Sequence, residues 1–228
     1  MKFLMAFFFL FTSHAGANCL KSLASRLGPE IDLSHSLDEN WRELNNDHSA
    51  WSIHNNEISP TNDFRHSDLI SLERFGNFAF TFEFKLGPGA NSGVKYLIQE
   101  ERGNIGLEFQ IIDKNNPNSK VNTKRQTGAL YDLFSSEIKN LSLIKGFNRG
   151  CIIFENGRGE HWLNGELVLK YSLNSVDFHK ALKLSKFKTF DWFGTFRQGH
   201  LLLQDHGDKV TFKKVHIQHI LRVFPFYD

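Results

Sequence analysis

The chain has 228 residues, of which 40% are hydrophobic and 23% are charged, with 17 Gly, 5 Pro and 2 Cys. This composition excludes disordered, collagen-like and disulfide-scaffold proteins. The 27 basic and 25 acidic residues give a formal net charge of +2, so neither a nucleic acid nor an anionic membrane is indicated as a partner. The length allows one large domain or two small ones, and all-β domains commonly reach this size as one unit. The 23 phenylalanines are the most unusual feature of the composition.

The first 17 residues have the pattern of a secretory signal peptide. Lys2 precedes an apolar run over residues 3–11, and Ala15-Gly16-Ala17 forms a small-residue cleavage site. We therefore expect export to the periplasm or the extracellular space. The run is too short to span a bilayer and no later stretch is apolar enough, so no transmembrane segment is expected. Residues 18–50 are predicted as an N-terminal extension that packs on a main domain of residues 51–228.

Cys19 and Cys151 are the only cysteines of the chain. An oxidising compartment permits a disulfide between them, but the sequence does not show that they meet, so two free thiols remain the alternative. The absence of a Cys-x-x-Cys pattern argues against a structural zinc site.

In chain order, the predicted elements are two short helices followed by strands. The helices are expected around residues 20–27 and 38–44. Phe78, Phe80, Phe82 and Phe84 alternate with less apolar residues, which is the period of a strand with one buried face. Strands are expected at residues 52–58, 78–85, 93–99, 105–112, 151–155, 160–171, 200–204 and 209–221. Polar turns between them predict an all-β, two-sheet antiparallel sandwich with short N-terminal helices.

Two local features refine this prediction. Asn164-Gly165 is a strong hairpin turn signal. In the last strand the apolar phase changes between Phe212 and Val215, which predicts a bulge near Lys213 and Lys214. Residues 185–199 are expected to form a long loop, where function often resides.

Candidate chemical groups lie in the strand at residues 105–112. Alternation places Glu108 and Gln110 on the face opposite the core, with Asp113 at the strand end. Gln204 and His206 project together in the same way, and a histidine is a base, acid or metal ligand near neutral pH. In each case the alternative is a solvated outer face or a structural turn.

Three further residues are weaker candidates. His161 precedes the Asn-Gly hairpin, Asn91 lies in a tight turn where its amide suits a polyol, and Trp192 lies among loop aromatics that suit stacking on a sugar ring. Each has a purely structural alternative. Phosphate-binding loops, zinc protease and esterase motifs, and basic clusters with interleaved aromatics are absent from the sequence, so no nucleotide or other organic cofactor is indicated.

Several short motifs, taken in order, resemble the 3-keto-disaccharide hydrolase family, formerly domain of unknown function 1080. They are Phe75-Gly76-Asn77-Phe78, Asn91-Ser92-Gly93, Glu108-Phe109-Gln110-Ile111-Ile112-Asp113, Gly128-Ala129-Leu130-Tyr131, His161-Trp162-Leu163-Asn164-Gly165 and Leu203-Gln204-Asp205-His206-Gly207. Each is weak alone, but the ordered set covers nearly all of the expected mature chain.

The resemblance implies a concanavalin-like jelly roll with a carbohydrate site on its concave face, acting on glycosides already oxidised to a ketone at C3. Such a ketone acidifies the C2 hydrogen, so one base removes it, the C1 substituent is eliminated and water adds back. Enolate charge then develops on the C3 oxygen, where a divalent metal or convergent hydrogen-bond donors lower the barrier.

Within this resemblance, we expect His206 or Glu108 to be the base or a metal ligand. Asp113 and His161 are further acid or ligand candidates. The expected substrate contacts are Asn91, Gln110, Gln204 and Trp192.

The alternative function is a non-catalytic, lectin-like carbohydrate-binding module, because the same fold serves both purposes. A conventional glucanase is a third reading, for which no pair of carboxylates has a suitable spacing.

Overall fold

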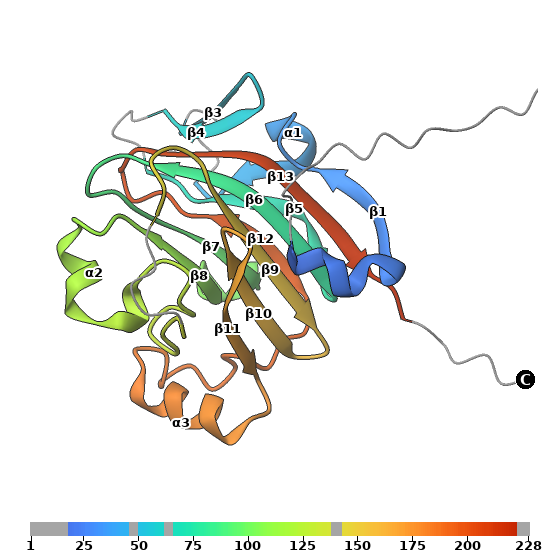
Figure 1. The fold of residues 1–228 in the computed structure, drawn as a ribbon, viewed down its shortest axis with the longest axis vertical. Coiled ribbons are helices and arrows are strands. Elements are labelled where there is room, and N and C mark those ends of the chain that lie inside the picture. Colours follow the sequence, from blue (N-terminus) through green and yellow to red (C-terminus); the bar gives the residue numbers. More distant parts are fainter. Residues whose placement is uncertain (1–17, 46–49, 62–65, 138–142, 223–228) are drawn as a thin grey trace, which may run out of the picture.

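Two antiparallel β-sheets stack face to face in the computed structural model, which describes residues 18–45, 50–61, 66–137 and 143–222 (Figure 1). The larger sheet has the strand order β11-β10-β9-β6-β13-β4-β3, with β1 paired to β13, and the smaller sheet has the order β2-β5-β12-β7-β8. This arrangement confirms the predicted all-β sandwich. The expected signal peptide lies outside the described residues.

The strands of the larger sheet are β1 (Leu27–Asp32), β3 (Trp51–His54), β4 (Glu57–Pro60), β6 (Phe78–Leu86), β9 (Asn148–Glu155), β10 (Arg158–Leu163), β11 (Glu166–Ser172) and β13 (Val210–Ile220). Those of the smaller sheet are β2 (Trp41–Glu43), β5 (Leu69–Phe75), β7 (Asn91–Ile98), β8 (Leu107–Ile112) and β12 (Gly199–Leu203). The helices are η1 (Asn18–Arg26), α1 (Leu37–Asn40), η2 (Glu100–Arg102), α2 (Pro117–Val121), η3 (Thr123–Arg125) and α3 (Val176–Leu184), where η denotes a 3-10 helix.

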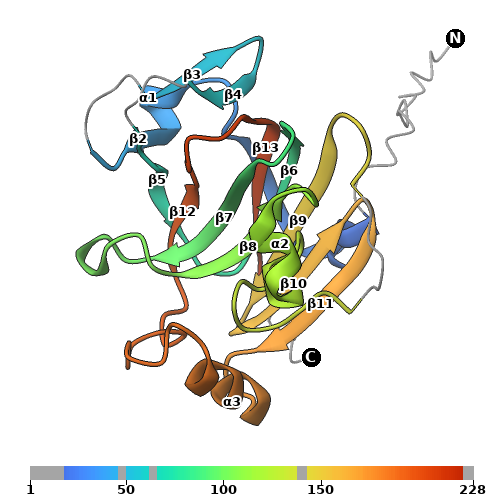
Figure 2. The same cartoon turned by 90° about the vertical axis from the view of Figure 1, so that its left-hand side faces the viewer.

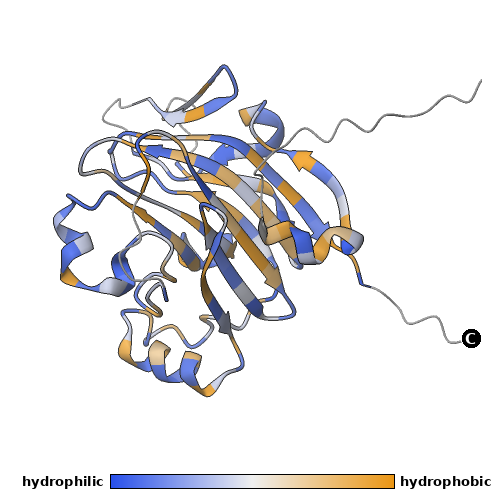
Figure 3. Cartoon of the chain, viewed as in Figure 1, coloured by the Kyte–Doolittle hydropathy of each residue, from blue (hydrophilic) through white to orange (hydrophobic). Residues whose placement is uncertain are grey.

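The alternating phenylalanines of β6 lie at the centre of the core. Phe78, Phe80, Phe82 and Phe84 are each at most 2% exposed, and Figure 3 shows the alternation of hydrophobic and hydrophilic residues along the strands. Phe82 meets Phe109 of β8 edge to face, with ring centroids 5.5 Å apart, so this pair joins the two sheets. Replacing one such ring with alanine would cost roughly 3–5 kcal/mol of stability.

Both local predictions for the larger sheet are confirmed. Asn164 and Gly165 have φ of 52° and 87° and connect β10 to β11, in the left-handed conformation that a two-residue hairpin turn requires. The register between β13 and β6 shifts between Lys213 and His216, and Lys214 has φ of 47°. The bulge allows both apolar phases of β13 to face the core.

The N-terminal residues differ from the prediction. The helix expected at residues 20–27 is the 3-10 helix η1, after which the chain continues directly as β1, and the helix expected at residues 38–44 is the single turn α1 followed by β2. Since β1 pairs with β13 and β2 with β5, this region supplies a strand to each sheet. Pairing with an existing sheet edge overrides weak local helix propensity here.

A disulfide joins Cys19 and Cys151, with their Cα atoms 6.8 Å apart and 132 positions between them in the sequence. It attaches η1 to β9 on the outer face of the larger sheet. Leu23, Ala79 and Ile153 are buried in the same small apolar cluster. The question that the sequence left open is thereby answered in favour of the disulfide.

Helix α3 was not predicted. Its N-cap Ser175 accepts a hydrogen bond from the Phe178 amide, and the Phe178 ring is buried against the core. Figure 2 shows α3 at one end of the sandwich, apart from both sheets. No helix within the described ranges is long and apolar enough to cross a bilayer.

Candidate functional site

The outer face of the smaller sheet carries a row of buried polar residues. Lys95 of β7 stands opposite Glu108 of β8, and Gly93 stands opposite Gln110. The amide of Gln204, which follows β12, donates to the carbonyl oxygen of Gly93 at 3.0 Å. Strand alternation therefore gathers the predicted residues Glu108, Gln110 and Gln204 on one face, while their neighbours along the strands face the core.

Glu108 is 5% exposed, and in the described part of the chain its carboxylate has no hydrogen-bond partner or ion pair. Burial raises the pKa of Glu108, and the positive charges of Lys95 and Lys186 oppose that rise. A buried carboxylate that is not satisfied by the protein is available to accept a proton from a ligand.

The amides of Gln110 and Gln204 leave their oxygen atoms free. The Gln110 side-chain nitrogen donates to the Asn91 side-chain oxygen at 2.8 Å and to the Ser92 carbonyl at 3.1 Å, which fixes the orientation of the amide. The Oε1 atoms of Gln110 and Gln204 are both buried and have no hydrogen-bond partner among the described residues. Such atoms are costly unless a ligand or water donates to them.

Gly93 leaves the space at the centre of this group. A Cβ atom there would lie 2.9 Å from Oε1 of Glu108 and 2.9 Å from Oε1 of Gln204. Two acceptor oxygens thus converge on the one position of β7 without a side chain. A sugar hydroxyl that donates to these oxygens could approach the backbone closely at that point.

A polar network continues from the site to the loops beside it. The Lys95 ammonium donates to the carbonyl of Asn104 at 3.0 Å, and the Asn104 amide donates to Asp68 at 2.7 Å. Asp68 also accepts the Asp205 amide at 2.9 Å. Asp68 and Asn104 line a cavity of about 350 Å³, together with Leu44, Asn45, His66, Ser67 and Asp205.

His206 lies at the edge of this network and is exposed. Although the residue as a whole is exposed, partial burial of its imidazole lowers the pKa of His206; Asp68 and Asp208 raise that pKa, and the charge of Lys95 lowers it further. The predicted His206 is therefore close enough to Lys95 and Asp68 to feel their charges. The predicted contact Asn91 has a supporting position instead, because its side chain holds Gln110 and its amide donates to Asp208 at 2.9 Å.

His161, a predicted acid or ligand candidate, lies between the two sheets. It is fully buried, contacts the Tyr96 hydroxyl at 2.8 Å and the Gly128 carbonyl at 3.0 Å, and packs on the core ring of Phe109. Burial lowers the pKa of His161 to about 4, so the ring is neutral. Its surroundings give it a structural position on the opposite side of β8 from Glu108.

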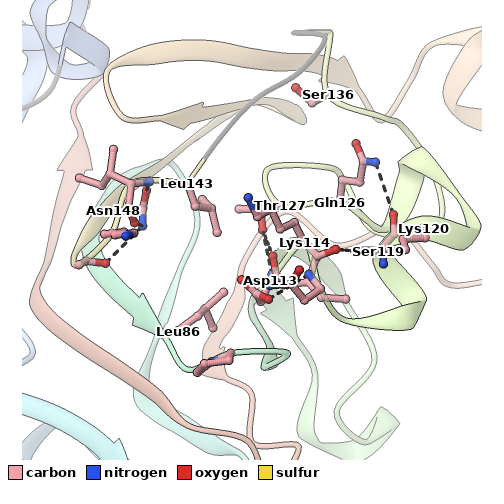
Figure 4. Close-up of a pocket in the computed structure, with 16 residues that line it drawn as sticks. Leu86, Asp113, Lys114, Ser119, Lys120, Gln126, Thr127, Ser136, Leu143 and Asn148 are labelled. Atoms are coloured by element: carbon pink, nitrogen blue, oxygen red, sulfur yellow. Dashed lines mark hydrogen bonds between the residues drawn. The ribbon is translucent and has the colours of Figure 1, made fainter.

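Asp113 lines a different cavity, of about 530 Å³, at the end of β8 (Figure 4). Its carboxylate accepts the amides of Gly89 at 3.0 Å and Asn115 at 2.9 Å. Burial raises its pKa, but these hydrogen bonds outweigh burial and hold the pKa of Asp113 below its ordinary value. In Figure 4 it lies beside Thr127 and Lys114, and the residues that line this cavity include none of Glu108, Gln110 and Gln204.

Trp192 packs within the aromatic loop, which is the segment of residues 185–198 between α3 and β12. Its ring centroid is 5.4 Å from that of Phe190, and the Arg102 guanidinium of η2 lies 5.7 Å from it. The ring is half-buried, and its role as a sugar-stacking residue stays a prediction.

Sequence reasoning missed Lys95, Asp68, Tyr131 and Lys186. Lys95 has the same strand phase as Gly93 within an otherwise apolar run, which was a usable signal. Tyr131 donates its amide to the Glu108 carbonyl at 3.1 Å, and the charge of Glu108 acts on its phenol. Asp68 and Lys186 reach the site from distant loops, for which the sequence held no local signal.

The divalent metal predicted at Glu108 and His206 stays a prediction. Within the described ranges, no three or more His, Cys, Asp or Glu side chains lie together as metal ligands. The charged groups beside Glu108 also include the ammonium groups of Lys95 and Lys186, which repel a cation.

Comparison with known proteins adds three findings. The 3-keto-alpha-glucoside-1,2-lyase-like domain family matches residues 32–218. A 3-keto-disaccharide hydrolase of Bacteroides thetaiotaomicron is 31% identical over an alignment of 177 residues, and the match covers 66% of this chain and 61% of that relative. A crystal structure of a proposed glycosyl hydrolase from Parabacteroides distasonis has a TM-score of 0.70 and 28% identity, over 80% of this chain and 89% of that one.

A more distant structure shows the fold alone. A second proposed glycosyl hydrolase from the same organism has a TM-score of 0.67 and 18% identity, over 84% of this chain and 100% of that one.

Proposed function

Because this chain belongs to the 3-keto-alpha-glucoside-1,2-lyase-like family, we propose that it cleaves 3-keto glycosides at the outer face of the smaller sheet. One observation carries the proposal. Glu108 is a buried carboxylate without a partner in the described residues, and it faces the gap at Gly93 beside two free amide oxygens. That arrangement suits a single base flanked by two amide oxygens that accept hydrogen bonds from sugar hydroxyls.

In the first step, Glu108 removes the C2 proton, and the electrons of the C2–H bond form a C2–C3 double bond with negative charge on the C3 oxygen. The raised pKa of Glu108 makes its carboxylate a stronger base than an exposed one. The neighbouring Lys95 ammonium stabilises the enolate charge. The free oxygens of Gln110 and Gln204 accept hydrogen bonds from sugar hydroxyls and fix the ring.

In the second step, the C3 carbonyl forms again, a C1–C2 double bond forms and the C1–O bond breaks. The leaving oxygen takes a proton from the protonated Glu108 or from His206 at the edge of the site. Water then adds across the double bond, with hydroxide at C1 and a proton at C2, and the product is a 3-keto sugar. The net reaction is hydrolysis.

We also propose that the protein is exported. The pattern of residues 1–17 supports this, and the disulfide between Cys19 and Cys151 suits an oxidising compartment.

The test is to incubate purified residues 18–228 with a 3-keto disaccharide and with its unoxidised parent, each with and without EDTA, in D₂O. We expect cleavage of the keto form alone, with deuterium at C2 of the product. Glu108→Gln should lower kcat by a factor of about 10² to 10⁴, whereas the control Glu101→Gln, on the exposed η2, should keep wild-type activity. Cleavage of the parent, or product without deuterium, would contradict the mechanism.

The second candidate is a carbohydrate-binding module, favoured by the Oε1 atoms of Gln110 and Gln204, which have no partner among the described residues and would accept hydrogen bonds from a polyol without any proton transfer. If wild-type protein binds the keto sugar without cleaving it, this second function is the correct one.

A further inference from the structure

Two cationic side chains share one aromatic ring beside Glu108. The Lys186 ammonium lies 4.2 Å from the centroid of the Tyr131 ring, and the Arg125 guanidinium lies 5.9 Å from it. In the described part of the chain, neither cationic group has a hydrogen bond or an ion pair with a carboxylate. The Nε atom of Arg125 is buried and has no hydrogen-bond partner within the ranges that the structure describes.

The backbone holds this group in place. The Asp132 carboxylate accepts the Lys186 amide at 2.7 Å, and the Asp132 amide donates to the Lys124 carbonyl at 3.1 Å. Asp132 has φ of 60°, a left-handed conformation that is unfavourable for a residue with a side chain. These contacts fix the start of the aromatic loop against the segment that carries Tyr131.

Tyr131 in turn is attached to β8, because its amide donates to the Glu108 carbonyl at 3.1 Å. Burial lowers the pKa of the Lys186 ammonium, the charge of Glu108 raises it, and the charge of Arg125 lowers it. The two cations therefore border the same site as the proposed base. The carboxylates of Glu108 and Asp132 oppose the repulsion of Lys186 by Arg125, but neither forms an ion pair with these cations in the described part of the chain. Both cationic groups, and the buried Nε donor of Arg125, therefore remain available to an anionic ligand.

We propose that Arg125 and Lys186 bind the carboxylate of a uronic acid unit in the substrate. This inference rests on the proposed function and names its substrate class. The planar guanidinium fork of Arg125 matches a carboxylate, and the Lys186 ammonium supplies a second point charge.

The experiment compares a 3-keto glucuronide with a 3-keto glucoside that has the same nitrophenyl leaving group. We expect wild-type kcat/KM to favour the glucuronide by about tenfold or more, mainly through KM, and the preference to fall as NaCl is added. Arg125→Gln and Lys186→Gln should each reduce the preference by about tenfold. Lys186→Arg, which keeps the positive charge, should retain the preference for the glucuronide, and so should the exposed control Lys188→Gln.

Equal rates on the two substrates in wild-type protein, or an unchanged preference in Arg125→Gln and Lys186→Gln, would overturn the inference and leave the proposed function intact. Cleavage of neither substrate would contradict the proposed function instead. Calorimetric titration with glucuronate and glucose then decides the inference by itself. Tighter binding of glucuronate that is lost in Arg125→Gln supports it, and equal binding of the two sugars overturns it.

Discussion

Lys95 and Glu108 stand directly opposite each other on β7 and β8, yet the Lys95 ammonium donates to the carbonyl of Asn104 and not to the Glu108 carboxylate. The lysine charge still acts on the carboxylate and opposes the effect of burial. Glu108 thus has a cation nearby without a direct ion pair. This relationship leaves the carboxylate free to take a proton while its basicity is tuned from across the strand pair.

The first prediction concerns the pH dependence of activity. Glu108 acts as a base only when deprotonated, and burial holds its pKa above the ordinary value of 4.5. The profile of kcat/KM against pH should therefore have an acidic limb, in which activity rises with pH, centred above pH 4.5. Lys95→Met removes a charge that lowers this pKa, so the limb should move to higher pH. The exposed control Lys120→Met should leave the limb in place. A limb that does not move in Lys95→Met would show that another group titrates.

The second prediction tests the gap at Gly93. A methyl group there would lie 2.9 Å from Oε1 of both Glu108 and Gln204, and these flexible side-chain ends can move aside. We therefore expect Gly93→Ala to fold but to lower kcat/KM by about 10- to 100-fold, because the substrate loses its close approach and Glu108 is displaced. Steady-state kinetics and a melting curve together check this. Wild-type kcat/KM in a folded variant would place the substrate elsewhere.

Most of the fold could be predicted from the sequence because strand alternation is a local signal. The phenylalanines of β6, the Asn164-Gly165 turn and the bulge at Lys214 each depend on residues close together in the chain. The N-terminal helices were predicted less well, because sheet edges formed by distant strands recruited β1 and β2.

For the candidate site, the same local signal placed Glu108, Gln110 and Gln204 on one face, but it could not distinguish exposure from burial. His161 shows the same limit, because it was a candidate site residue whose side chain lies in the core. Its phase on β10 points to the core, where it meets Tyr96 from the other sheet. Lys186 and Asp68 come from loops that only the tertiary structure brings to Glu108.

The third prediction concerns the disulfide. Cys19 and Cys151 close a long loop, so replacing both by serine should lower the free energy of unfolding by roughly 2–5 kcal/mol. The pair lies on the outer face of the larger sheet, across the core from Glu108, so kcat on a 3-keto substrate should be unchanged. Urea unfolding of wild-type protein with and without a reductant provides the matched comparison. A large loss of kcat with intact folding would indicate coupling between this face and the site.

The fourth prediction concerns stability in acid. The folded-state pKa of His161 is lowered to about 4 from an ordinary 6.5, so folding favours its neutral form. Its contribution to stability is therefore fully present above pH 6.5 and is lost as pH falls toward 4. The full effect is about 3 kcal/mol.

The variant His161→Leu tests this assignment. It loses the hydrogen bonds to Tyr96 and Gly128 and should be less stable than wild type at pH 8, but its stability should fall less between pH 6.5 and pH 4. The control His54→Leu replaces a ring that is exposed on β3, and it should keep the wild-type slope. Urea unfolding at a series of pH values measures both quantities. If the free energy of unfolding of His161→Leu fell with pH as steeply as that of wild type between pH 6.5 and pH 4, another group would cause the acid sensitivity. The neutral, buried His161 would then not account for the stability of the contact between the two sheets.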